Sequence, residues 1–421
     1  MRVVVVVALC CLAGCQRESA PTSTQGEALA LALFSLPARA PGSLDAALAR
    51  AQADARARPG KVNSWVDVGE LWVLLARERA DPGFYLHAGA AADLGLALSP
   101  DNVDARRLRA STLVNAHAFR EARALCEALL ALDPDDARAL GLLSDALYEL
   151  GDIDGALKAT ERMVTLSDGL PARSRRAWLR FIRGDVAGAR VDHEAAITDS
   201  VATAEARAFV AADAGNLSFW QGDLASAERA FVFAAQQIPD FGPALVGRAR
   251  TALARGDPAS ATALAKTAWQ ERRSLEAAAL LLALMGPGQE ALALERDALA
   301  HARRTDPRSA ALWLATRSSA AADLNEARRL VDVELKVHND PYTYDVASVV
   351  ALARGELSDA RRYSDAALAH GTPDPRLLAR GGIIRLAQGD ASGRALIKRA
   401  LAANALFDPV WAPRAQAALG P

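Results

Sequence analysis

Alanines recur along most of this chain at a nearly constant interval of 30 to 38 residues. The recurring alanines are Ala88, Ala122, Ala156, Ala189, Ala227, Ala261, Ala291, Ala327, Ala360 and Ala395. A period in the range of about 20 to 50 residues is typical of stacked repeats, in which each unit buries its apolar face only against its neighbours. The sequence therefore predicts a stack of similar units and not a domain with one central core.

The residues around each alanine predict what one unit looks like. A glycine stands five residues before most of the alanines, and an acidic residue usually follows it, as in Gly151-Asp152. Glycine adopts a positive φ without a Cβ clash, so it can end one helix, and an acidic residue suits the N-terminus of the next. Prolines, which close the second helix, stand twelve residues after three of the alanines: Pro100, Pro134 and Pro239. No stretch has the period-two, β-branched pattern of a strand, so we expect two helices per unit and no sheet.

This unit resembles the tetratricopeptide repeat, whose length is about 34 residues. The clearest match is residues 137–168, where Leu147, Ala156 and Met163 fall at apolar positions of the family pattern. The resemblance extends over Lys61–Leu406. It implies an all-α fold, a right-handed α-solenoid of about ten stacked antiparallel helix-turn-helix units.

Two units depart from the family pattern. The unit around Ala189 lacks the expected middle of its first helix, and the unit around Ala291 has Gly286-Pro287-Gly288 in its turn. Such units could bend the stack or divide it in two. The predicted segments are a lipoprotein signal peptide (1–14), a flexible tether (15–26), an N-terminal helical cap (27–60), the solenoid (61–405) and a C-terminal cap or tail (406–421).

The first fifteen residues bear on location. Val3–Leu12 is an apolar stretch too short to span a bilayer, and Leu12-Ala13-Gly14-Cys15 follows it. This tetrapeptide resembles the bacterial lipoprotein signal, which implies lipidation at Cys15 and, because Gln16 is not Asp, an outer-membrane protein facing the periplasm. Several acyl chains together would hold the protein stably on a membrane. A cleaved secretory signal with incidental cysteines and a cytoplasmic protein with an apolar start are the alternatives.

The sequence contains little that indicates chemistry. Its motifs include no nucleotide-binding glycine loop, no metal-binding His pair and no nucleophile elbow, so we expect a protein that is not an enzyme, with no catalytic residues, metal, cofactor or small-molecule substrate. Cys126 is the one cysteine outside the first fifteen residues, and its repeat position predicts a buried, unreactive side chain.

Charge limits the partners. With 49 basic and 50 acidic residues and a pI near 6.6, the chain lacks the excess of positive charge that nucleic-acid binding requires. One helix stripe is nevertheless basic, and it consists of Arg173, Arg176, Arg180 and Arg183. The stripe is either a site for an anionic partner or a solvated face.

Protein or peptide partners are expected in a groove, because the resemblance implies that inward residues of each first helix line a concave surface. These residues are Arg107, Ser111, Asn115, Arg138, Asp145, Tyr148, Asn216, Phe219 and Trp220. Phe219 and Trp220 are adjacent aromatic residues in a chain with only 5% aromatics, so they could anchor a partner. Core packing of at least one of them is the alternative.

Together these features favour a non-enzymatic binding scaffold of the bacterial cell envelope, lipid-anchored at Cys15. A second hypothesis is a pilotin-like or assembly-factor lipoprotein of a secretion, pilus or outer-membrane machine. A third is an enzyme or a carbohydrate-binding lipoprotein within the solenoid, which would need clustered carboxylates in a deep pocket.

Overall fold

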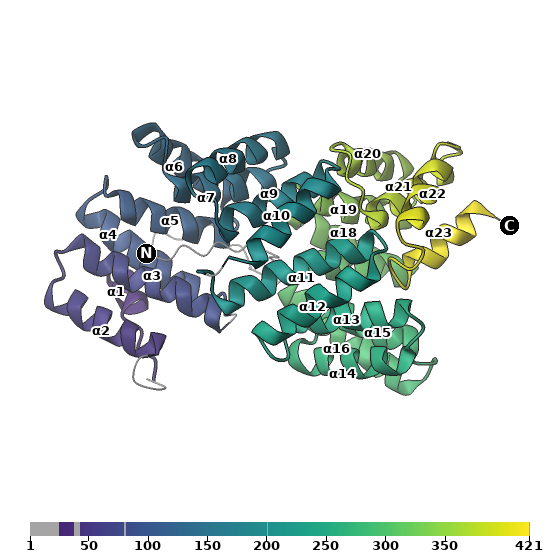
Figure 1. Cartoon of the computed structure of the whole chain (residues 1–421), viewed down its shortest axis with the longest axis horizontal. Coiled ribbons are helices and arrows are strands. Elements are labelled where there is room, and N and C mark those ends of the chain that lie inside the picture. Colours follow the sequence, from purple (N-terminus) through teal and green to yellow (C-terminus); the bar gives the residue numbers. More distant parts are fainter. Residues whose placement is uncertain (1–24, 38–42, 80, 200, 421) are drawn as a thin grey trace. The chain divides into compact units, whose positions relative to one another are not determined.

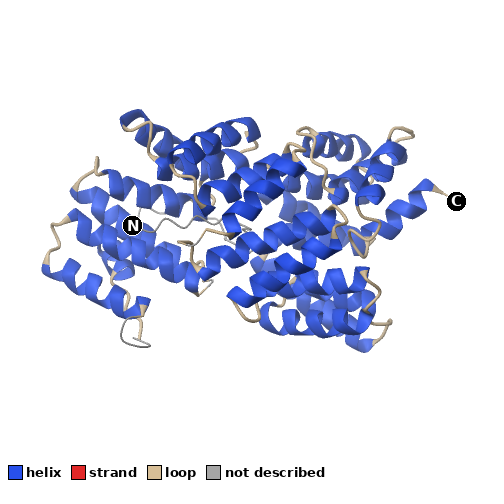
Figure 2. Cartoon of the chain, viewed as in Figure 1, coloured by secondary structure: helices blue, strands red, loops and turns tan. Residues whose placement is uncertain are grey.

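The computed structural model describes residues 25–37, 43–79, 81–199 and 201–420, and in these ranges every regular element is a helix (Figures 1 and 2). The described residues fall into two compact units, an N-terminal unit up to Ser167 and a C-terminal unit from Asp168 onward. The predicted all-α solenoid is confirmed. Cys15 lies outside the described residues, and none of the described helices is long and apolar enough to cross a membrane.

The N-terminal unit contains three helical hairpins, α3–α4, α5–α6 and α7–α8, preceded by two further helices. Its helices are α1 (Gln25–Ala32), α2 (Leu44–Ala57), α3 (Val62–Glu78), α4 (Phe84–Leu98), α5 (Val103–Asn115), α6 (Phe119–Leu132), α7 (Ala137–Glu149) and α8 (Ile153–Leu166).

The C-terminal unit contains seven hairpins, from α9–α10 to α21–α22, and a last helix α23. Its helices are α9 (Leu170–Ile182), α10 (Val186–Ile197), α11 (Ala204–Trp220), α12 (Leu224–Gln237), α13 (Gly242–Ala254), α14 (Pro258–Arg272), α15 (Leu275–Leu284), α16 (Gln289–Thr305), α17 (Pro307–Arg317), α18 (Ala321–Glu334), α19 (Pro341–Ala353), α20 (Leu357–Leu368), α21 (Pro375–Ala387), α22 (Gly393–Ala403) and α23 (Trp411–Leu419).

The turns within the hairpins form as their sequence predicts. Gly151 has a φ of +83°, and the Asp152 side chain accepts a hydrogen bond from the Gly155 backbone N–H at 2.9 Å, which caps α8. In the α5–α6 hairpin His117 occupies the glycine position with a φ of +58°. The left-handed turn therefore forms in this hairpin even though its sequence does not supply glycine.

Eight of the ten recurring alanines are completely buried, each with 0% of its surface exposed. Ala291 is only half-buried, and Ala395 is exposed. The prediction that the recurring alanine is buried at the helix crossing is therefore wrong for these two units. In the last unit Gly393 takes the buried place, because a Cβ there would overlap the Gly382 carbonyl oxygen of the facing helix. What recurs with the repeat is therefore a small residue, alanine or glycine, at the point where the two helices of a hairpin meet.

The α9–α10 and α15–α16 hairpins correspond to the two irregular units. Helix α9 is complete, so the missing family residues in the unit around Ala189 do not shorten its first helix. The C-terminal unit also has separate hydrophobic cores. One spans α9–α13 and includes Phe181 and Phe231, and another spans α17–α23 and includes Phe407 and Trp411.

Replacing Ala156 with Leu should overpack the α7–α8 hairpin and lower the free energy of unfolding by about 1 to 3 kcal/mol, because Ala156 has no exposed surface into which a larger side chain could turn. Urea unfolding followed by circular dichroism measures the change. The matched control is Ala395→Leu, at an exposed helix position, which should change stability by less than about 0.5 kcal/mol. Equal effects of the two substitutions would contradict this account of the period.

Candidate functional site

The first helices of the N-terminal unit carry a polar inner face, called here the N-terminal groove and made up of Glu70, Arg107, Ser111, Asn115, Arg138, Asp145 and Tyr148. Arg138 of α7 donates to a Glu70 carboxylate oxygen of α3 at 2.6 Å, two hairpins earlier. Helices two hairpins apart can be joined by one ion pair only on the side toward which the stack curves. Arg138 and Glu70 therefore lie on the side toward which this unit curves, where the other residues of the N-terminal groove are predicted to lie.

Several groove residues are fixed by neighbours within the unit. The Arg107 Nε donates to Asp136 at 2.6 Å and its Nη1 to Asp104 at 2.8 Å. Burial alone would lower the pKa of Arg107, but its bonds to these two carboxylates outweigh burial and raise the pKa. The Asn115 amide donates to the Ser111 carbonyl at 2.8 Å, and Asp145 and Tyr148 are half-buried on α7. The groove thus presents oriented, partly exposed polar groups.

The arginine stripe of α9 binds carboxylates of its own hairpin. The buried carboxylate of Asp192, on α10, accepts from Arg176 at 2.8 Å and from Arg180 at 2.7 Å. Arg173 also pairs with Asp168 at 2.5 Å. Arg183, the last member, is exposed at the end of α9. Arg173, Arg176 and Arg180 therefore have acidic partners in the unit, so their charges help to hold this hairpin together.

Phe219 and Trp220 are buried, with 1% and 5% of their surfaces exposed. The guanidinium carbon of Arg376 lies 3.9 Å from the Trp220 ring centroid, and the Arg250 guanidinium carbon lies 5.3 Å from the Phe219 ring centroid. Arg250 also donates to the Asn216 side-chain oxygen at 2.5 Å. These contacts favour core packing over the anchor hypothesis for both aromatic residues.

The inner positions of α9 and α11 meet elements that lie more than 150 residues further along the chain. The Trp178 and Tyr342 rings stack at 5.5 Å, and the Asn404 amide donates to the Phe219 carbonyl at 2.6 Å, across 185 residues. We call this contact the seam; it consists of Trp178, Gly184, Phe219, Trp220 and Gly222 on one side and Tyr342, Gly371, Arg376, Ala403 and Asn404 on the other. No sequence pattern indicated it.

Buried charges surround the seam. Burial alone would raise the pKa of Asp374, but the bidentate Arg376 guanidinium beside it and the Tyr342 hydroxyl hold that pKa below its usual range. Asp213, on α11, is half-buried and meets no charged partner among the described residues, and its burial raises its pKa to about 7. Burial likewise lowers the pKa of Arg250.

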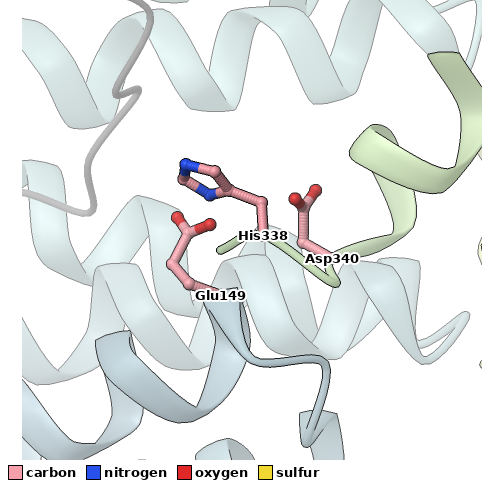
Figure 3. Close-up of side chains that lie close together, drawn as sticks. All are labelled: Glu149, His338 and Asp340. Atoms are coloured by element: carbon pink, nitrogen blue, oxygen red, sulfur yellow. The ribbon is translucent and has the colours of Figure 1, made fainter. Parts of the chain in front are cut away.

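Two of the residues in Figure 3, His338 and Asp340, lie on the segment that enters α19. Asp340 accepts from the Tyr342 and Thr343 backbone N–H groups and caps this helix, so its carboxylate has a structural role. Glu149, the third labelled residue, is the last residue of α7 in the other unit. Over its described residues, neither unit alone gathers three His, Cys, Asp or Glu side chains at metal-binding distance. Cys126 is buried, and burial raises its pKa to about 12, as expected of an unreactive thiol.

Stacked antiparallel hairpins with tight turns and small residues at the helix crossings define an α-solenoid. Residues 113–165, which cover the end of α5 to α8, match the tetratricopeptide repeat family model. This part of the chain therefore consists of tetratricopeptide repeats, and proteins built from this repeat are generally non-catalytic interaction scaffolds.

Solved structures of other repeat proteins are similar in fold. PilF of Pseudomonas aeruginosa is 18% identical with a TM-score of 0.41, over 52% of this chain and 96% of its own. PilW, a type IV pilus biogenesis factor, is 16% identical with a TM-score of 0.37, over 63% and 92%. Human IFIT1, solved with a capped RNA, is 13% identical with a TM-score of 0.45, over 89% and 94%. These likenesses show the fold alone, and no curated protein matches the sequence.

Asp213 should make the stability of the C-terminal unit depend on pH. An unfolded Asp has a pKa of about 3.9, whereas folded Asp213 keeps its proton up to about pH 7. The folded state therefore binds more protons between these values, and stability falls as pH rises through that window. Asp213→Asn, which cannot ionise, should remove this part of the fall and be more stable than the wild type above about pH 7.

Urea unfolding of both proteins at about pH 5 and about pH 8 measures the effect. Asp223→Asn is the control, because hydrogen bonds from Ser226 hold the pKa of Asp223 low, so Asp223 is ionised at both pH values and its loss should change stability by the same amount at both. A difference between Asp213→Asn and wild type that is the same at both pH values would contradict the assignment.

Proposed function

We propose that this protein is a lipid-anchored interaction scaffold of the bacterial cell envelope, which binds protein partners in the N-terminal groove and catalyses no reaction. The observation that supports the proposal is the difference between the inner positions of the two units, each considered by itself. In the N-terminal unit the Arg138–Glu70 pair marks a curved face whose polar groups are partly exposed. In the C-terminal unit the corresponding positions, Phe219 and Trp220, are buried within the unit itself.

The chemistry of the groove favours a polar peptide segment. Arg107 and Arg138 present guanidinium groups, and Asp145, Ser111 and Asn115 present oxygens and an amide at neighbouring positions. Such mixed groups can bond to the backbone and side chains of a partner, and the pairs already made hold several of them in place. Complexes made through these polar groups should depend on hydrogen bonds and on salt.

The anchor is the second part of the proposal, and it follows from the likeness of Leu12-Ala13-Gly14-Cys15 to a lipoprotein signal. Replacing Cys15 with Ser should abolish lipid attachment, so the protein should leave the membrane fraction. Metabolic labelling with palmitate, with membrane fractionation of the same cells, checks this. Label that persists in Cys15→Ser would contradict the anchor but would leave the groove hypothesis intact.

Photo-crosslinking in cells tests the groove. A photoreactive amino acid at Ser111 or Asn115 should crosslink one dominant partner, whereas the same amino acid at the exposed α6 positions Arg123 and Glu127 should not. The crosslink should disappear when Arg138→Glu reverses a groove charge. A partner belonging to one secretion or pilus machine would identify an assembly factor. Crosslinks from α6 alone would contradict binding in the groove.

A further inference from the structure

We propose that the seam is a reversible latch, which holds the C-terminal unit closed and whose release uncovers Trp178 and Trp220 while the helical hairpins stay folded. The proposal is independent of the partner and of the anchor. It concerns a conformational equilibrium within residues 168–421.

The seam joins hairpins at a constant spacing. Trp178 on the first hairpin of the unit meets Tyr342 on the sixth, and Trp220 on the second meets Arg376 on the seventh. Both contacts therefore join hairpins that are five apart along the stack. After five hairpins the superhelix has curved back to its beginning, so the later hairpin lies against the earlier one. Closure is thus a regular property of the stack.

The seam has few contacts compared with the hydrophobic cores on its two sides. Among the described residues its contacts include the Trp178–Tyr342 ring stack, the Arg376 guanidinium against Trp220 and Tyr342, and the hydrogen bond from Asn404 to the Phe219 carbonyl. Among the described residues, the hydrophobic cores of α9–α13 and of α17–α23 are separate clusters on its two sides. Because each hairpin of a solenoid is held by its neighbours along the stack, the seam can open without loss of either core.

The closed state also leaves buried polar groups unsatisfied. The Trp220 Nε1–H and the Arg250 Nε–H are both buried without a hydrogen-bond partner. A buried donor without a partner is unfavourable relative to the same donor in water. Opening would hydrate the Trp220 Nε1–H, which lies at the seam, so its burial favours release and brings the closed and open states closer in free energy.

Two turn glycines allow the seam to close. A Cβ on Gly222 would lie 2.5 Å from the Ala403 carbonyl oxygen, and a Cβ on Gly184 would lie 3.1 Å from the Gly371 carbonyl oxygen. Gly256 holds the same turn position in the next hairpin with the same φ of +77° as Gly222, yet a Cβ there would meet nothing within 4 Å. Gly222 therefore meets two requirements, a left-handed turn and a close approach across the seam.

This difference supplies a matched pair of variants. Gly222→Ala and Gly256→Ala introduce the same backbone strain, but only Gly222→Ala places a methyl group in the seam. Hydroxyl-radical footprinting of the full chain should show a several-fold rise in oxidation of Trp178 and Trp220 in Gly222→Ala and no rise in Gly256→Ala. Hydrogen exchange within α11 and α13 should remain slow in both variants.

Two results would overturn the latch. One is oxidation of Trp220 that is equal in the two variants; the other is loss of slow exchange throughout α9–α13 together with the rise in oxidation, which would make the seam part of a single cooperative core. If Gly222→Ala does not fold, Asn404→Ala removes the hydrogen bond to Phe219 without adding atoms and should raise the oxidation of Trp220 by a smaller factor. Unchanged oxidation in that variant would also overturn the proposal.

Discussion

The close crossing of the two helices in each hairpin is the constraint on which the rest of the structure depends. At the crossing only a methyl group or a hydrogen atom fits, as the fully buried Ala156 shows and as the near contact of Gly393 with Gly382 shows more strongly. Where the crossing loosens, burial is lost: in the α15–α16 hairpin Ala291 is only half-buried and Leu292 is 54% exposed. A tight crossing also restricts the turn, and in seven of the ten described hairpins the connection includes a residue in the left-handed region.

Ion pairs recur between successive hairpins. Arg107 binds Asp136, Arg328 binds Glu356 and Arg361 binds Asp390, each pair 28 or 29 residues apart along the chain. Partly exposed pairs of this kind contribute only about 0 to 1 kcal/mol each, so their main effect is on the register of neighbouring hairpins.

Sequence predicted those features that are local or periodic. The hairpins, their turns and most buried alanines follow from residues within one repeat, and these predictions are confirmed. Asp192 was not predicted as the partner of the α9 arginines, because nothing in its own neighbourhood distinguishes it from a solvent-exposed acid.

The seam was beyond prediction for a stronger reason. It joins Phe219 to Asn404 across 185 residues, and its existence depends on the curvature accumulated over five hairpins. The adjacent aromatic residues Phe219 and Trp220 were compatible with both a groove and a core. The contact of Trp220 with Arg376, which lies more than 150 residues later in the chain, favours the core over the groove.

The number of hairpins in a unit decides what its inner surface can do. Contacts across the seam join hairpins that are five apart. The C-terminal unit has seven hairpins and therefore two such pairs, one that meets through Trp178 and one that meets through Trp220. The N-terminal unit, with three hairpins, has none, and there Arg138 bonds to Glu70 two hairpins away. Equivalent repeat positions therefore become core in the longer unit and partly exposed surface in the shorter one. An inner residue of such a repeat is best assigned a role only after the hairpins of its own unit have been counted.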